Sequence, residues 1–451
     1  MATISIYIAC QQTGYFPTAW GRGRLSTIPK GGEARDPSKI TDLRPLTMLS
    51  EMGKMLERLI GLKMKEANVE ALSDNQYGFR RSRSAVDAMR AGVVDFLKDP
   101  ANGKHRMFIS LDIKGAFDHA WWPAIMNNIR QKGYPKDIAA LWLSYFSDRI
   151  VTLSDSGEKA EKRLTKGAPQ GSVRGPEAWN LIADTLLRKD TPPGCQVFAF
   201  ADDIGYCIGG NTAAEVARKA AIIMGIAEEW ARNNKLVFST GKCWRLIYKN
   251  TTRITRTFLH GEPIPTVDSG RYLGVIIDKD LNFEAHAHYV AGKIKKLFMA
   301  LRRLVLRREA NYRCPLDVYR GAILPVATYA AEVWGHRCNV TRVARPLDSA
   351  QTACLIGVTG AYSTTSAPAL QAATGVPLLR MAVQALAARR IGLEQGETDL
   401  FGMHIVLPPP PPAPARPNEK RELSSKSPWK PGRGTGKRNP EAEPPPSSVP
   451  S

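Results

Sequence analysis

The stretch VFAFADDIGYCI, from Val197 to Ile208, places two adjacent aspartates, Asp202 and Asp203, between two runs of apolar residues. Both runs are rich in the aromatic and β-branched residues that favour strands. Burying two neighbouring carboxylates costs free energy unless a cation lies beside them. The pair therefore belongs either to a solvated turn, where an Asp-Asp pair alone is commonplace, or to a metal site.

A second acidic position bears on the choice between these interpretations. We expect Phe198–Phe200 to pair with Gly205–Ile208 as a β-hairpin with the two aspartates at its tip. In FISLDIKGAFDH, residues 108–119, Asp112 ends another apolar strand. If the two strands are neighbours, the three carboxylates meet at one end of a sheet. Such a group can hold two divalent cations for in-line phosphoryl transfer.

The composition narrows the class of protein. The chain has 451 residues, enough for two or three structural units, and 63 Lys and Arg against 42 Asp and Glu give a formal charge of +21. This charge favours a polyanionic partner such as nucleic acid, or an anionic membrane surface. No apolar run approaches the roughly 20 residues that span a bilayer. The N-terminus lacks a secretory signal, so we expect an unsecreted, intracellular protein.

The apolar periodicity predicts an α+β protein in which strands and helices interleave. Seven scattered cysteines without a Cys-x-x-Cys pair predict neither a disulfide framework nor a zinc knuckle. The composition changes from Gly396, and after Leu407 the chain is proline-rich and basic with few large apolar residues, which predicts a disordered tail in 396–451. The predicted strands are 105–113 and 196–203, and the predicted helices are 48–68, 85–98, 176–187, 213–234 and 289–309.

Eight sequence blocks follow one another between Gly14 and Asp278. They are GYFPTAWGRGRLSTIPK, DLRPLTMLSEMGKMLERLI, LSDNQYGFRRSRSAVDAM, FISLDIKGAFDHAWW, TKGAPQGSVRGPEAWNLIADTLL, FAFADDIGYCI, NNKLVFSTGKC and RYLGVIID. In this order they resemble the polymerase domain of the non-LTR (LINE-type) retrotransposon reverse transcriptases. The resemblance overturns the solvated-turn interpretation of the aspartate pair.

The resemblance implies an α+β right-hand polymerase of fingers, palm and thumb, followed by a helical C-terminal region and a disordered tail. The regions it implies are fingers and palm in 1–250, a primer-grip-like segment and thumb in 251–310, the helical region in 311–395, and the Pro-rich basic tail in 396–451. The family commonly carries an upstream endonuclease and a downstream Cys/His knuckle. We therefore expect this chain to be part of a larger element, or a copy truncated at both ends.

The resemblance also implies roles for individual residues. Asp112, Asp202 and Asp203 would hold two Mg²⁺ ions, with Mn²⁺ as a possible substitute. Phe117 would lie beneath the sugar of the incoming nucleotide and exclude a 2′-hydroxyl. The other implied roles are contacts of Lys30 and Arg44 with the triphosphate, contacts of Gln170 and Gly171 with nucleotide or template, and protonation of the leaving pyrophosphate by Lys242.

Two positions depart from the family pattern. Arg174 stands where an aliphatic residue is usual, and Cys243 follows Lys242 where a hydroxyl residue is common. Each of the implied side chains also has an ordinary alternative, as a core aromatic, a solvated lysine or a helix-entry loop. The order of the blocks is what favours the functional roles.

The predicted helix 289–309 has one apolar and one basic face. Its basic face fits a thumb helix lying on a template-primer backbone, because each neutralised phosphate releases counterions. The apolar face comprises Ile294, Leu297, Phe298, Leu301, Leu304 and Val305, and the basic face Lys295, Lys296, Arg302, Arg303, Arg307 and Arg308.

The sequence thus predicts an RNA-directed DNA polymerase that extends a DNA primer with dNTPs on an RNA template, at target DNA in the nucleus or otherwise in the cytoplasm. A decayed or repurposed nucleic-acid-binding remnant, without turnover, is the alternative. An RNA-templated RNA polymerase is disfavoured by Phe117 and by FADD in place of a Gly-Asp-Asp box.

Overall fold

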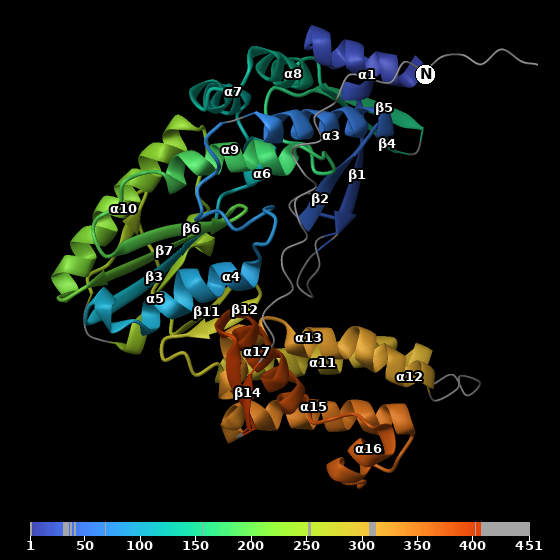
Figure 1. The fold of residues 1–451 in the computed structure, drawn as a ribbon, viewed down its shortest axis with the longest axis vertical. Helices are drawn as coiled ribbons and strands as arrows, with labels where there is room; N and C mark the ends of the chain where they lie inside the picture. Colours follow the sequence, from blue (N-terminus) through green and yellow to red (C-terminus); the bar gives the residue numbers. More distant parts are fainter. Residues whose placement is uncertain are drawn as a thin grey trace, which may run out of the picture.

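The computed structural model describes residues 2–29, 36, 38–39, 42–67, 69–155, 157–250, 254–305, 313–401 and 403–406. Two four-stranded sheets, a layer of helices and a helical C-terminal region make up this part of the chain (Figure 1). The predicted α+β class is confirmed. No described helix combines the length and apolar character needed to cross a membrane.

The central sheet has the strand order β6-β7-β3-β8, and all of its neighbouring strands are antiparallel. Successive side chains of these strands enter two different cores: Met107 and Ile109 point to one, and Phe108 to the other. Burial on both faces explains why the strands read as continuous apolar runs. The strands are β3 (His105–Leu111), β6 (Cys195–Phe200), β7 (Asp203–Gly210) and β8 (Trp244–Ile247).

One face of the central sheet is covered by helices whose apolar residues share a core with it. The longest, α10, begins after Thr212, whose side chain accepts a hydrogen bond from the backbone N–H of Glu215. The helices that contribute to this core are α3 (Glu51–Glu66), α7 (Trp122–Gln131), α8 (Lys136–Phe146), α9 (Gly175–Leu187) and α10 (Ala213–Asn233).

The opposite face packs on α4 (Ala85–Met89), a π-helical turn (Arg90–Val94) and α5 (Asp95–Lys98). This run starts at a capping box between Ser84 and Asp87. The predicted helix 85–98 is therefore present, but a π turn interrupts it. Gly92 in that turn lies against the Phe198 ring, where a Cβ atom would be 2.7 Å from a ring carbon.

The second sheet has the order β2-β1-β4-β5 and lies beside α3 (Figure 1). Its strands are β1 (Gly23–Pro29), β2 (Leu43–Leu49), β4 (Ile150–Asp155) and β5 (Glu158–Arg163). β1 pairs antiparallel with β2 and parallel with β4. Short elements elsewhere in this half are α1 (Ala2–Thr13), α2 (Thr18–Gly21), α6 (Ala116–His119), β9 (Phe258–Leu259), β10 (Glu262–Pro263) and the 3-10 turns Pro100–Asn102, Thr240–Lys242 and Tyr248–Asn250.

The C-terminal region follows a hairpin of β11 (Ser269–Tyr272) and β12 (Val275–Asp278). Its helices pack around the fully buried Trp334 and Tyr319. They are α11 (Glu284–Val305), α12 (Arg313–Val318), the π turn Tyr319–Ile323, α13 (Leu324–Thr328), α14 (Ala331–Trp334), the 3-10 turn Gly335–Asn339, α15 (Thr341–Thr359), α16 (Ala367–Thr374) and α17 (Leu379–Gln395).

Two sequence-based boundaries change in this region. Helix α11 begins at Glu284, before the predicted start at residue 289, and residues 306–309 lie outside the described part of the chain. The predicted tail began too early, because β13 (Glu397–Leu400) and β14 (Met403–Val406) pair as a hairpin against α17. Thr398 and Leu400 are half-buried there, and this alternation is too short to stand out in the sequence. Residues from 407 onward are outside the described range.

Candidate active site

The three predicted carboxylates gather at one end of the central sheet. Asp112 directly follows β3, Asp202 occupies the turn between β6 and β7, and Asp203 is the first residue of β7. Leu111 is paired with Ile204, so the end of β3 lies beside the tip of the hairpin. The predicted hairpin is confirmed, but its pairing starts at Phe200 opposite Asp203, closer to the tip than expected.

The electrostatics of this group are unfavourable for three negative charges. Desolvation, followed by the charges of Asp202 and Asp112, raises the pKa of Asp203 to about 6, although its side chain is open to solvent on one side. Desolvation also raises the pKa of Asp202, and the charge of Asp112 adds to this. A cation beside them would lower both pKa values, because it stabilises the ionised carboxylates.

Asp112 has one oxygen without a hydrogen bond. Its Oδ2 atom is buried and has no hydrogen-bond partner, although Lys242 Nζ lies 3.3 Å away as an ion-pair partner. The backbone N–H of Asp112 donates to Cys243 Sγ at 3.4 Å, so the unusual cysteine still supports this position. The Lys242 side chain is 71% exposed, and its ammonium group is the positive charge that pairs with Asp112.

The carboxylates fit a cation site only in part. Within the described residues, no three His, Cys, Asp or Glu side chains are grouped closely enough to hold a metal ion by themselves. The raised pKa values, and the Oδ2 atom of Asp112 that lacks a hydrogen bond, are nevertheless the features that a bound cation would relieve. Hard divalent cations take oxygen ligands, and phosphate groups can complete their coordination.

A cavity of about 300 Å³ adjoins this group and is lined by Phe117, Gln170, Gly171 and Asp202. The structure therefore brings together four residues that come from three separate sequence blocks. The Phe117 ring is half-buried and packs on Trp179, with ring centroids 5.9 Å apart. The chemistry of this cavity combines an aromatic surface, an amide and a carboxylate.

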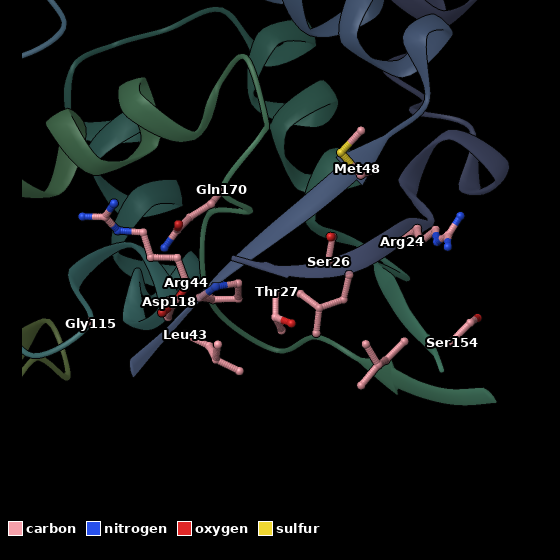
Figure 2. A pocket seen from close by; sticks show the side chains of 13 residues that line it. Arg24, Ser26, Thr27, Leu43, Arg44, Met48, Gly115, Asp118, Ser154 and Gln170 are labelled. Carbon is pink, nitrogen blue, oxygen red and sulfur yellow. The ribbon is translucent and has the colours of Figure 1, made fainter. Parts of the chain in front are cut away.

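A larger cavity of about 1120 Å³ lies between the second sheet and the loop that carries Gln170 (Figure 2). Arg44, on β2, and Gln170 both line it, near Asp118 and Gly115. Arg44 thus shares a cavity with Gln170 but does not line the smaller one beside Asp202. Lys30, the other predicted triphosphate ligand, lies outside the described residues.

The loop that carries Gln170 is attached to β2 by its backbone. The N–H of Thr47 donates to the carbonyl of Gln170 at 2.7 Å. Gly171 has φ 121°, and a Cβ atom there would lie 2.4 Å from the Thr47 carbonyl oxygen. Only glycine combines this conformation with this close approach. Gly171 therefore fixes the loop, in addition to lining the smaller cavity.

The far end of the loop is held by a buried carboxylate that sequence analysis left without a role. Glu57 on α3 is 1% exposed, and its Oε2 accepts from Ser172 Oγ at 2.8 Å, Val173 N at 2.6 Å and Arg174 N at 3.0 Å. Arg149, also 1% exposed, places Nη2 3.8 Å from Glu57 Oε1. A glutamate in an amphipathic helix gives no sequence signal of burial, so this anchor was missed.

The second unusual residue, Arg174, is accommodated by its neighbours. Its guanidinium forms an ion pair with Glu177 in the first turn of α9. It also lies over Gly61 of α3, where a Cβ atom would be 2.0 Å from Nη1. Because Gly61 has no side chain, it supplies the space that the Arg174 guanidinium occupies.

Comparison of the sequence with known proteins identifies the family to which the chain belongs. Residues 28–277 match the family of reverse transcriptases (RNA-dependent DNA polymerases). The chain is 30% identical over 412 residues to a putative 115 kDa protein of the type-1 retrotransposable element R1DM of Drosophila melanogaster, with 89% of this chain and 39% of that protein covered. It is 24% identical to the RNA-directed DNA polymerase from mobile element jockey of the same fly, with 73% of this chain and 37% of that protein covered.

The chain thus spans between one third and two fifths of the length of these relatives. Among solved structures, apo telomerase from Candida Tropicalis is 10% identical with a TM-score of 0.43, covering 79% of this chain and 66% of that one.

When no divalent cation is bound, we expect Asp203→Asn to raise the thermal stability of the protein, and we expect the size of this effect to depend on pH. The pKa of Asp203 is raised from 3.8 to about 6 in the folded protein, so the folded state binds the extra proton and stability falls as pH rises from about 4 to about 6. The variant should have a higher Tm at pH 7.5, by about 1–3 °C because solvent screens the exposed group. The gain should shrink at pH 5.

Thermal unfolding in a chelator, followed by circular dichroism at both pH values, measures this effect. Asp190→Asn is the matched control, because Asp190 is an exposed aspartate beyond the end of α9. A Tm of Asp203→Asn at or below that of the unmodified protein at pH 7.5 would contradict the repulsion.

The buried ion pair predicts a large effect of Glu57→Gln on the free energy of unfolding. The substitution leaves the buried Arg149 guanidinium without its counter-charge, which typically costs about 3–5 kcal/mol. Glu66→Gln, on the same helix but exposed, should change it by less than about 0.5 kcal/mol. Urea unfolding curves compare the two, and equal midpoints would show that the pair does not hold the loop.

Proposed function

The chain belongs to the reverse transcriptase family of non-LTR retrotransposons, and we propose on this premise that it is itself an RNA-directed DNA polymerase. It joins a dNTP to the 3′-hydroxyl of a DNA primer on an RNA template. The observation that supports this most strongly is the meeting of Asp112, Asp202 and Asp203 at a sheet end, beside the cavity of Phe117, Gln170 and Gly171.

The family implies the use of divalent metal, and the three aspartates are the residues that would hold two Mg²⁺ ions, or Mn²⁺ in their place. When bound, such ions lower the pKa of an attacking hydroxyl and stabilise the leaving oxygens of the phosphate. The protein contributes position and charge rather than a covalent intermediate. Its raised carboxyl pKa values make cation binding compete with protons below about pH 6.

Lys242 fits two successive tasks in this proposal. Its ammonium group pairs with Asp112 and offsets part of the negative charge of the carboxylates. Because the side chain is 71% exposed, it can swing away from Asp112 toward a bound pyrophosphate. There it donates the proton that the leaving group needs.

The other predicted site residues contact the incoming nucleotide or the template. Arg44 reaches the triphosphate with a guanidinium, which suits phosphate oxygens. Gln170 and Gly171 contact the nucleotide or the template. The Phe117 ring, which lines the same cavity as Asp202, occupies the space that a 2′-hydroxyl requires.

Helix α11 contributes to the binding of the template-primer. Lys295 and Lys296 are exposed, while Ile294 and Phe298 are buried in the C-terminal core. The predicted separation of a basic and an apolar face is therefore present over these residues. The side chains of Arg302, Arg303, Arg307 and Arg308 lie outside the described part of the structure.

Asp202→Asn and Asp112→Asn should each abolish polymerisation without unfolding the protein. Each removes a charged oxygen from the proposed metal site, and we expect a loss of at least about 100-fold. Extension of a DNA primer on an RNA template with dNTPs and Mg²⁺ measures it, with Asp190→Asn as control. Extension by either variant at the control rate would refute the metal assignment. Template binding without extension by the unmodified chain would instead indicate a nucleic-acid-binding remnant.

Phe117→Ala should weaken discrimination between dNTP and rNTP. Removing the ring opens the space beside the sugar, so the ratio of rNTP to dNTP incorporation should rise at least about tenfold. Single-nucleotide extension with matched dNTP and rNTP measures the ratio. An unchanged ratio in an otherwise active variant would make Phe117 an ordinary packing residue.

A further inference from the structure

A short segment, Gln76–Phe79, lies along the edge of the central sheet next to the turn that carries Asp202. Gln76 forms a parallel bridge with Ala199 of β6. The N–H of Tyr77 donates to the Ala199 carbonyl at 2.8 Å, and the N–H of Ala199 donates to the Asn75 carbonyl at 2.9 Å. The segment therefore acts as a short additional strand that ends where β6 ends.

The side chain of Gln76 continues this pairing where the backbone turns away. It is 1% exposed, and its Oε1 accepts from Ala201 N at 3.1 Å and from Gly78 N at 2.8 Å. Its Nε2 points to the Ala201 carbonyl at 3.4 Å. The side-chain amide thus takes the place of the next peptide group in the ladder.

The Ala201 peptide needs such support because of its conformation. Ala201 has φ 58°, in the left-handed region that residues with a side chain rarely adopt. Its carbonyl also accepts from Trp179 Nε1 at 2.8 Å. Both polar groups of Ala201 are therefore held by buried side chains, and Ala201 directly precedes Asp202.

Gly78 brings the segment into direct contact with this turn. A Cβ atom at Gly78 would lie 2.2 Å from Ala201 N and 2.8 Å from its Cα. These are backbone atoms, so no side-chain movement could relieve the overlap. Glycine is required here for close approach, not for an unusual φ angle.

Phe79 extends the contact to the cavity side. It has φ 57° and is 58% exposed, and its ring meets Phe117 edge to face with centroids 6.1 Å apart and planes at 89°. Phe117 in turn packs on Trp179, the residue that donates to Ala201. A closed circuit of contacts therefore links Gln76, Ala201, Trp179, Phe117 and Phe79.

We propose that Gln76–Phe79 is a positioning element that holds the Asp202 turn and the Phe117 ring in one fixed relation to each other. Gln76 and Gly78 set the turn, and Phe79 sets the ring from its solvent side. The consequence for sugar discrimination rests on the proposed polymerase function. In the proposed polymerase, Asp202 would face the reacting phosphate and Phe117 the sugar. Their relative position would therefore affect both the reaction and the selection of the nucleotide.

Hydrogen exchange tests the contact with the turn independently of activity. Gln76→Met keeps the side-chain length but removes the hydrogen bonds to Ala201. Amide exchange in peptides that cover 197–208, read by mass spectrometry, should become about tenfold faster at the turn. Gln12→Met, at an exposed position of α1, is the control. Exchange equal to that of the control would overturn the role of Gln76.

Nucleotide selection tests the contact with the ring. Phe79→Ala should raise the ratio of rNTP to dNTP incorporation by about two- to tenfold, the range expected for one aromatic pair. The double variant Phe79→Ala/Phe117→Ala should discriminate no worse than Phe117→Ala alone, because Phe79 acts through that ring. Phe258→Ala, 51% exposed on β9, is the control.

The outcomes separate the two proposals. If Phe117→Ala raises the ratio and Phe79→Ala does not, or if the two effects add, Phe79 does not position the ring. If the unmodified chain extends no primer, the polymerase function fails, while the exchange measurement still decides whether Gln76 holds the turn.

Discussion

The pairing of β3 with β7 is the constraint on which the site depends. With Leu111 opposite Ile204, Asp112 emerges beside the turn that carries Asp202. Side chains of both strands enter cores on the two faces of the sheet, so a slip of one residue would exchange the contents of both cores. The register of the carboxylates is therefore enforced by packing that takes no part in the chemistry.

This enforcement is necessary because the site itself is unfavourable. Burial and mutual repulsion raise the pKa values of Asp202 and Asp203, and Ala201 adds a left-handed backbone. A non-glycine residue in that conformation costs on the order of 1–3 kcal/mol. Such a cost persists only where the surroundings over-determine the conformation, and the buried strands and the side chains of Gln76 and Trp179 provide this.

The sequence predicted the strand that leads to Asp112, the hairpin of Asp202 and the helices α3, α9, α10 and α11, because each has a strong local pattern. It also predicted that Phe117, Gln170 and Gly171 belong with Asp202, but only through the order of the blocks. It did not predict the π turn at Arg90–Val94 or the hairpin of β13 and β14, because both depend on contacts with distant elements: Gly92 with the Phe198 ring, and β13 with α17.

The buried polar contacts were missed for a related reason. Glu57 and Arg149 look like ordinary surface residues of a helix and a loop, and Gln76 looks like a polar residue of a connection. Each becomes buried because a separate segment folds over it. Glu57 Oε2 accepts from the backbone N–H groups of Val173 and Arg174, and Gln76 Oε1 accepts from that of Ala201. Arg149 has Glu57 as its counter-charge, with Nη2 3.8 Å from Oε1. A buried polar group without partners destabilises the fold. Such a group can therefore be buried at low cost only where another segment supplies its hydrogen-bonding or charged partners. The periodicity of one segment gives no information about the polar partner in another segment. The buried side chain and its partner come together only in the folded protein.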